Sequence, residues 1–181
     1  PIFDDSYYGS VIHEIREMQI VNMGQYAHGN QPIQHMIYLY NFAGAPYKTQ
    51  YWSRHVMDKL YFATPDGYCG DEDNGQTSAW YVFSALGFYP VTPATDQYVL
   101  GAPLFKEATI HLENGKKIEI KAQANSNDNL YVKSLKMNNT AYSKNWLSHK
   151  ELLKGEVLKF EMSKTLNKER GNKEKDFIYY L

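Results

Sequence analysis

The chain has 181 residues, 43% of them hydrophobic, and a formal net charge of -1 at pH 7. A chain of this length buries a substantial core, and a charge so close to zero gives no electrostatic basis for binding nucleic acid. No run approaches the roughly 20 apolar residues of a membrane-spanning helix, and the first residues do not have the pattern of a signal peptide. The single cysteine, Cys69, excludes an internal disulfide and is interpreted as a packed small hydrophobe.

Hydrophobic periodicity predicts four helices in the first half of the chain. They are expected at residues 6–24, 32–44, 48–61 and 76–86. Ser6 suits the cap of the first helix, Pro32 suits the first turn of the second, and Gly87 closes the fourth. Four helices joined by glycine-containing loops suggest part of an α/α assembly.

Beyond Pro90 and Pro93 the hydrophobic period changes from 3.6 to 2, which predicts strands. Apolar and polar residues alternate on both sides of Asn114-Gly115, a turn signal typical of an antiparallel hairpin. Further expected elements are a hairpin around 138–139, a short helix with a Ser148/Glu151 capping box, a last strand at 158–162, a loose charged tail at 164–175 and an edge strand at 177–181.

This change of period predicts an α+β fold, with a helical N-terminal half and an antiparallel β C-terminal half. Since prolines disfavour the continuation of a helix, we place the boundary after Pro93. The helical region is then residues 1–93, and the β-rich region is residues 94–181.

An acidic loop bracketed by glycines, residues 70–75, leads directly into the predicted helix 76–86. Glycines let the backbone turn sharply, and free N–H groups at a helix start stabilise nearby carboxylates. In a tight loop Asp71 and Asp73 can converge on a water or a metal ion, which suits acid–base or cation chemistry. Glu72 points away from both in an extended backbone and is left out. The alternative is a solvated loop with an Asx-type helix cap.

Several long motifs follow one another in a fixed order along the chain. They are Phe3-Asp4-Asp5-Ser6-Tyr7-Tyr8-Gly9, His13-Glu14-Ile15-Arg16-Glu17-Met18, His28-Gly29-Asn30-Gln31-Pro32, Tyr38-Leu39-Tyr40-Asn41, Gly70 to Trp80, Ala85-Leu86-Gly87-Phe88-Tyr89-Pro90 and Tyr98-Val99-Leu100-Gly101-Ala102-Pro103-Leu104-Phe105. Together they resemble the closing part of glycoside hydrolase family 92. The resemblance implies an inverting, calcium-dependent exo-α-mannosidase, with α-1,2-linked mannose as a candidate substrate. It also implies the last helices of an α/α barrel followed by β structure, in a protein several times longer than this chain.

The resemblance also implies roles for five residues. Asp71 and Asp73 match the base-side motif of the family, with Asp73 as the principal general base and Asp71 as its partner in holding the water. Asn30 and Gln31 are expected to offer neutral oxygen ligands to Ca²⁺, and His28 is a candidate substrate contact. Many family members have a glutamate at the position of Gln31, so the amide keeps an oxygen ligand but loses a charge. Without the family, Asn30 and Gln31 would be interpreted as helix caps.

The family's general acid belongs to a glutamate motif that we do not find in this sequence. The isolated chain is therefore expected to be inactive and to bind calcium weakly or not at all. The expected partners are a mannose-containing glycan and the preceding part of the parent protein, and the resemblance implies a secreted or periplasmic location. A non-catalytic carbohydrate-binding module and a purely structural fragment stay open as alternatives. A hydrolase needs the pair Asp71 and Asp73, whereas a binding module does not.

Overall fold

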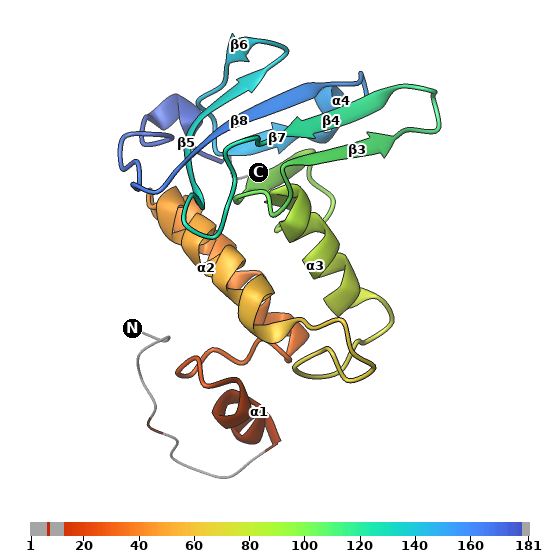
Figure 1. Ribbon diagram of the computed structural model, residues 1–181, viewed down its shortest axis with the longest axis vertical. Coiled ribbons are helices and arrows are strands. Elements are labelled where there is room, and N and C mark those ends of the chain that lie inside the picture. The colour runs from red at the N-terminus through yellow and green to blue at the C-terminus, as the bar shows by residue number, and fades with distance from the viewer. Residues whose placement is uncertain (1–6, 8–12, 179–181) are drawn as a thin grey trace.

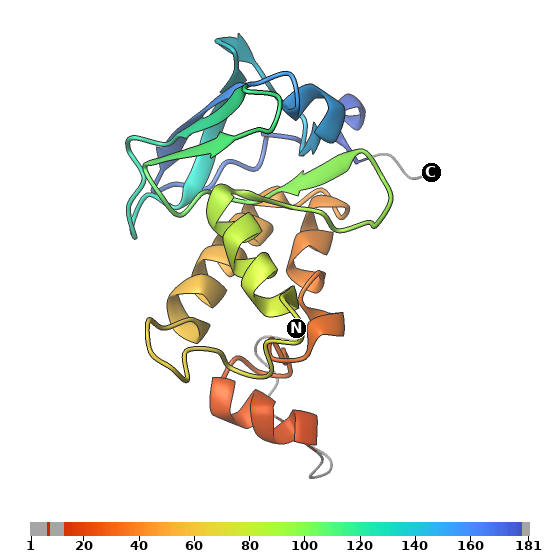
Figure 2. The same cartoon turned by 90° about the vertical axis from the view of Figure 1, so that its right-hand side faces the viewer.

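The computed structural model describes residue 7 and residues 13–178. Its helical part contains α1 (His13–Val21), the 3-10 helices η1 (Gln31–Ile33) and η2 (Met36–Asn41), α2 (Pro46–Leu60) and α3 (Gln76–Leu86). The part after α3 contains β1 (Phe88–Tyr89), β2 (Gln97–Leu100), β3 (Glu107–His111), β4 (Lys117–Lys121), β5 (Tyr131–Met137), β6 (Thr140–Ala141), β7 (Trp146–Ser148), α4 (His149–Leu152), β8 (Val157–Ser163) and η3 (Glu174–Asp176). The helices and the sheets form separate layers, which confirms the predicted α+β fold (Figures 1 and 2). Among the described helices, none has the length and apolar character needed to cross a membrane.

The two longest helices follow local signals in the sequence. The helix α3 has the predicted bounds, and Gly87 ends it in a left-handed conformation (φ 94°) with its N–H bonded to two carbonyls of the last turn. The helix α2 starts two residues before the expected position, at Pro46, because proline fits the first turn. The helix α1 lies within the first predicted range, and its expected cap Ser6 lies outside the described residues.

The single helix predicted at residues 32–44 is wrong, because this segment forms the two short 3-10 helices η1 and η2. In an α-helix the carbonyls of Gln34 and Ile37 would accept from N–H groups four residues later. Here the Gln34 carbonyl accepts a hydrogen bond from Trp80 Nε1 (3.0 Å) and the Ile37 carbonyl accepts one from Thr49 Oγ1 (2.8 Å). These side-chain donors compete for the helix carbonyls, and the backbone takes the tighter turn.

The strands form a three-stranded sheet of order β1-β2-β7 and a five-stranded sheet of order β3-β4-β8-β5-β6. Both predicted hairpins are present, with Ile110 opposite Ile118 in the first. The expectation of purely antiparallel pairing is wrong for β4 and β8, which are parallel. The strand β8 lies between the inner strands of the two hairpins, which run in opposite directions, so it must be parallel to one of them.

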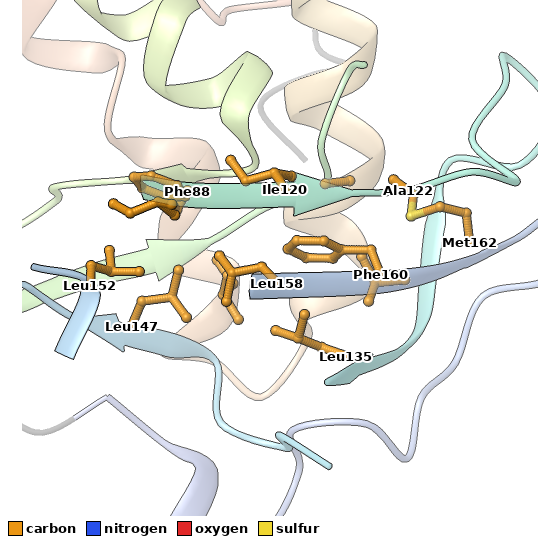
Figure 3. Packing of buried hydrophobic residues seen from close by; sticks show 13 residues of the cluster. Phe88, Ile120, Ala122, Leu135, Leu147, Leu152, Leu158, Phe160 and Met162 are labelled. Carbon is orange, nitrogen blue, oxygen red and sulfur yellow. The ribbon is translucent and has the colours of Figure 1, made fainter. Parts of the chain in front are cut away.

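The hydrophobic core has two parts that share Phe83. One part joins the sheets, and its buried side chains meet between the strands in Figure 3. The other fills the helical layer around Tyr26, Tyr38 and Trp80. The sheet β1-β2-β7 includes strands on both sides of residue 93, and the domain boundary placed there stays a prediction.

The charged tail is not loose, contrary to the expectation for residues 164–175. Arg170 is 8% exposed and donates to Asn145 Oδ1 (3.2 Å) and to the Lys144 carbonyl (3.1 Å), so the segment packs against the β7 region. Phe177 and Ile178 form no strand among the residues described, and positions 179–181 lie outside them. The edge strand is therefore wrong for 177–178.

Candidate active site

Two segments that are far apart in the sequence meet backbone to backbone near the start of α3, at the end of that helix that points away from the sheets (Figures 1 and 2). A Cβ on Gly70 would lie 2.6 Å from the Cα of Gly29, and a Cβ on Gly29 would lie 2.8 Å from the Cys69 carbonyl oxygen. Only glycine permits such an approach. Gln31 Nε2 donates to the Asp71 carbonyl (2.9 Å) beside this contact. The fold thus joins the segment 28–31 and the acidic loop 70–75 into one site.

The acidic loop enters α3 through three consecutive residues in the left-handed region. Their φ angles are 50° at Asp73, 56° at Asn74 and 100° at Gly75. Asp, Asn and Gly are the residue types that tolerate this conformation. Asp71 and Asp73 are exposed, and within the described part of the chain their carboxylates make no hydrogen bond or ion pair. Both carboxylates are therefore available to a water or a substrate.

The helix start is capped by Glu72, the acid that we left out of the candidate pair. Its carboxylate accepts hydrogen bonds from Ser78 Oγ (2.6 Å), Gly75 N (2.7 Å) and Ser78 N (3.2 Å). These bonds, led by the Ser78 hydroxyl, lower the pKa of Glu72. The alternative of an Asx-type cap is wrong, because a glutamate makes the cap and leaves Asp71 and Asp73 unused.

His28 lies in the core beneath the loop, with no exposed surface. Its Nδ1 shares a hydrogen bond with the Tyr26 hydroxyl and its Nε2 shares one with the Tyr61 hydroxyl, both at 2.8 Å. Burial lowers the pKa of His28 to about 3, so the imidazole is neutral at pH 7. The substrate contact of His28 stays a prediction, and in this structure the ring has no atom at the surface with which to reach a sugar.

The side chains of Asn30 and Gln31 are not helix caps. Asn30 precedes η1 without a side-chain capping bond, and the Gln31 amide is directed to the Asp71 carbonyl instead. Among residue 7 and residues 13–178, no group of three or more His, Cys, Asp or Glu side chains could hold a metal ion. The oxygens that the side chains of Asn30 and Gln31 offer are neutral, and calcium accepts neutral oxygens alongside carboxylates.

Two polar residues that the sequence did not single out complete the site. Thr77 Oγ1 donates to the Asp71 carbonyl (3.0 Å), and Gln34 Nε2 donates to Thr77 Oγ1 (3.1 Å) and to the His28 carbonyl (3.2 Å). Gln34 has no exposed surface, and Thr77 is 1% exposed. The sequence offers little signal for them, because Thr77 stands between Gln76 and Ser78 and Gln34 stands beside His35, so neither differs from its polar neighbours.

Comparison with known proteins shows that the chain is similar to mannosidases. Residues 2–164 match the model of the glycosyl hydrolase family 92 catalytic domain. The chain is similar to a solved family GH92 inverting mannosidase of Bacteroides thetaiotaomicron VPI-5482, with 55% identity and a TM-score of 0.83 over 95% of this chain and 23% of that chain. A family GH92 α-mannosidase of Bacteroides thetaiotaomicron, solved with mannoimidazole, has 36% identity and a TM-score of 0.91 over 98% of this chain and 23% of that chain.

A curated relative comes from a fungus. The chain is 27% identical over 142 residues to an uncharacterized secreted glycosidase of Arthroderma benhamiae (strain ATCC MYA-4681 / CBS 112371), covering 75% of this chain and 18% of that protein. The chain thus spans about a fifth of the length of the relatives that it matches.

Proposed function

The chain belongs to glycosyl hydrolase family 92, and we propose on this premise that it supplies the general base of an inverting, exo-acting α-mannosidase. The observation that carries the proposal is the acidic loop. Asp71 and Asp73 are exposed without side-chain partners among the described residues, while the backbone beneath them is fixed by the Gly29–Gly70 contact. Free carboxylates on a rigid support suit the orientation and deprotonation of a water.

In the proposed mechanism the two carboxylates act on one water. In an inverting glycosidase the base activates a water on one face of the sugar, while an acid about 6.5–9.5 Å away protonates the leaving oxygen on the other face. Asp73 takes the proton, and Asp71 accepts the second hydrogen bond of the water and orients it. We call the longer family 92 protein that contains this chain the complete enzyme. The general acid comes from another part of that protein. In that protein α1, α2 and α3 are proposed to be the last helices of an α/α barrel.

The stereochemistry of the product tests this proposal. The complete enzyme should release β-mannose first from an α-1,2-linked mannobiose, because attack from the opposite face inverts the anomeric centre. Proton NMR of the early reaction distinguishes the two anomers before they equilibrate. The isolated chain should show no turnover, since it lacks the acid. Release of α-mannose first, or turnover by the isolated chain, would contradict the assignment.

We also propose that Asn30 and Gln31 contribute to a calcium site. Gln31 Nε2 is used by the Asp71 carbonyl, which leaves the amide oxygen as its free atom, and the Asn30 side chain has no partner among the described residues. These two neutral oxygens fit part of a calcium shell, and the charged ligands must come from the rest of the complete enzyme. A bound calcium ion would orient sugar hydroxyls and favour the distorted ring of the transition state.

Metal removal provides the test of this site. Activity of the complete enzyme should be lost on exhaustive chelation and restored by Ca²⁺, while isothermal titration calorimetry of the isolated chain should show weak binding or none, because affinity depends on ligand charge and number. A control titration with the calcium-saturated chelator excludes inhibition by the chelator itself. Full activity after exhaustive chelation would remove calcium from the proposal and leave the base assignment in place.

A mannose-containing glycan is the proposed substrate, and a secreted or periplasmic location is proposed with it. The solved relative with mannoimidazole and the secreted fungal glycosidase support these two proposals.

A further inference from the structure

The carbonyl oxygen of Asp71 receives two side-chain hydrogen bonds from opposite parts of the site. Gln31 Nε2 donates from the exposed side at 2.9 Å, and Thr77 Oγ1 donates from the buried side at 3.0 Å. A carbonyl has two lone pairs, so these donors account for its full accepting capacity. One donor comes from the segment before α2 and the other from α3. The position of the peptide between the two proposed carboxylates is therefore set by two elements at once.

The buried half of this arrangement is a directed chain of hydrogen bonds. Gln34 Nε2 donates to Thr77 Oγ1 at 3.1 Å, so the hydroxyl proton of Thr77 is free to point at the Asp71 carbonyl. The Gln34 amide is held in turn, because its Oε1 accepts from Gln76 Nε2 (3.4 Å). Gln34 Nε2 also donates to the His28 carbonyl (3.2 Å), so both hydrogens of this amide are used and its orientation is set. The donated hydrogen bond in turn orients the otherwise rotatable Thr77 hydroxyl toward the Asp71 carbonyl.

From this geometry we infer that Thr77 is a positioning residue for the proposed base, with Gln34 acting behind it. The inference rests on the proposed function of the acidic loop. Thr77 Oγ1 bonds to the backbone of Asp71 and to no carboxylate, so it acts on the position of Asp71 and Asp73 and not on their chemistry. A misplacement of about 1 Å caused by a distant change can cost on the order of 10²-fold in rate, so a residue that holds the loop can affect kcat without touching the substrate.

The chain offers a matched control for this role in Thr49. Thr49 has no exposed surface, donates to the backbone carbonyl of Ile37 (2.8 Å) and accepts from the side-chain amide of Asn41 (2.8 Å). Its pattern of bonds is the same as that of Thr77, but it ties η2 to α2 and does not contact the acidic loop. Replacing either threonine by valine removes the same two hydrogen bonds at nearly constant volume.

The experiment compares Thr77→Val with Thr49→Val in the complete enzyme. Both should lower the thermal midpoint by similar amounts, whereas Thr77→Val alone should lower kcat by about tenfold with KM nearly unchanged, since binding contacts are intact. Thr77→Ser, which keeps the hydroxyl, should restore most of kcat. Hydrogen exchange at the backbone amides of residues 70–75 should become faster in Thr77→Val and stay at the wild-type rate in Thr49→Val.

The connection to Gln34 is tested by a double-mutant cycle. Gln34→Met should also lower kcat, and the double variant Gln34→Met/Thr77→Val should lose no more than Thr77→Val alone, because both act through one chain of bonds. Equal kcat losses in Thr77→Val and Thr49→Val, or wild-type exchange of residues 70–75 in Thr77→Val, would overturn the inference. If Asp73→Asn keeps its activity, the proposed function fails instead, while the exchange data still report whether Thr77 holds the loop.

Discussion

Replacing Asp73 by asparagine in the complete enzyme is expected to lower kcat by at least about 10², because an amide cannot take a proton from water. The substitution is well suited to this position. Asp73 has a φ of 50°, and asparagine tolerates this left-handed conformation, as the neighbouring Asn74 at 56° already does. The loss should therefore reflect missing base chemistry and not a rebuilt loop. Steady-state kinetics with an α-mannobiose, alongside thermal unfolding, separates the two effects.

The control for this variant is Asp66→Asn, which removes an exposed carboxylate from the turn between α2 and α3 without touching the acidic loop. It should keep normal kinetics. Asp71→Asn should lose less than Asp73→Asn, since an amide oxygen still accepts a hydrogen bond from the water. Near-normal turnover by Asp73→Asn would assign Asp73 to structure, and a larger loss in Asp71→Asn would exchange the two roles.

The elements that the sequence predicted are those determined by local interactions. The helix α3 has a glycine at each end, and the hairpin β3–β4 has Asn114-Gly115 at its turn. The residues that end these elements are therefore adjacent to them in the sequence and can be recognised there. The two 3-10 helices could not be predicted in this way. Their type depends on Trp80 and Thr49, which reach the segment only after the chain has folded.

The charged tail shows the same limit for polar residues. A run rich in lysine and glutamate indicates solvent exposure, because these residues are seldom fully buried. Arg170 is nevertheless buried, and its guanidinium is satisfied in part by an amide oxygen and a carbonyl oxygen. Burial lowers the pKa of Arg170 to about 10, which still leaves it charged at neutral pH. Its acceptors come from 144–145, a segment distant in sequence.

In the candidate site, the candidate residues could be predicted from the sequence, but the hydrogen bonds and the backbone contact that hold them in place could not. Motifs identified Asp71, Asp73 and Gln31 by resemblance. The bond from Gln31 to the Asp71 backbone and the relay through Thr77 depend on side-chain directions that periodicity does not specify. The Gly29–Gly70 contact could not be predicted from the sequence either. A glycine in a loop usually indicates a turn, and nothing in the sequence shows that a second backbone segment packs against it.

Because of that contact, we expect Gly70→Ala to lower both the stability of the protein and the kcat of the complete enzyme. The new Cβ would lie 2.6 Å from the Cα of Gly29 and 2.8 Å from its carbonyl oxygen, and backbone atoms cannot move aside as a flexible side chain can. The two segments must separate, which should lower the free energy of unfolding by about 1–3 kcal/mol, as overpacking usually does. The same separation displaces the acidic loop, so kcat of the complete enzyme should fall by up to about 10² even where the variant is fully folded.

Gly101→Ala is the matched control for this prediction. Gly101 is buried and Gly70 is half-buried, but a Cβ on Gly101 would lie 3.4 Å from the Tyr38 ring and 3.5 Å from Ser53 Oγ, an ordinary packing distance. It should change stability little and leave kcat unchanged. Thermal unfolding and kcat should be measured for both variants below the first unfolding transition. If Gly70→Ala matches Gly101→Ala in both measurements, the two segments have room to part without displacing the carboxylates, and the glycine contact is not what holds the proposed base in place.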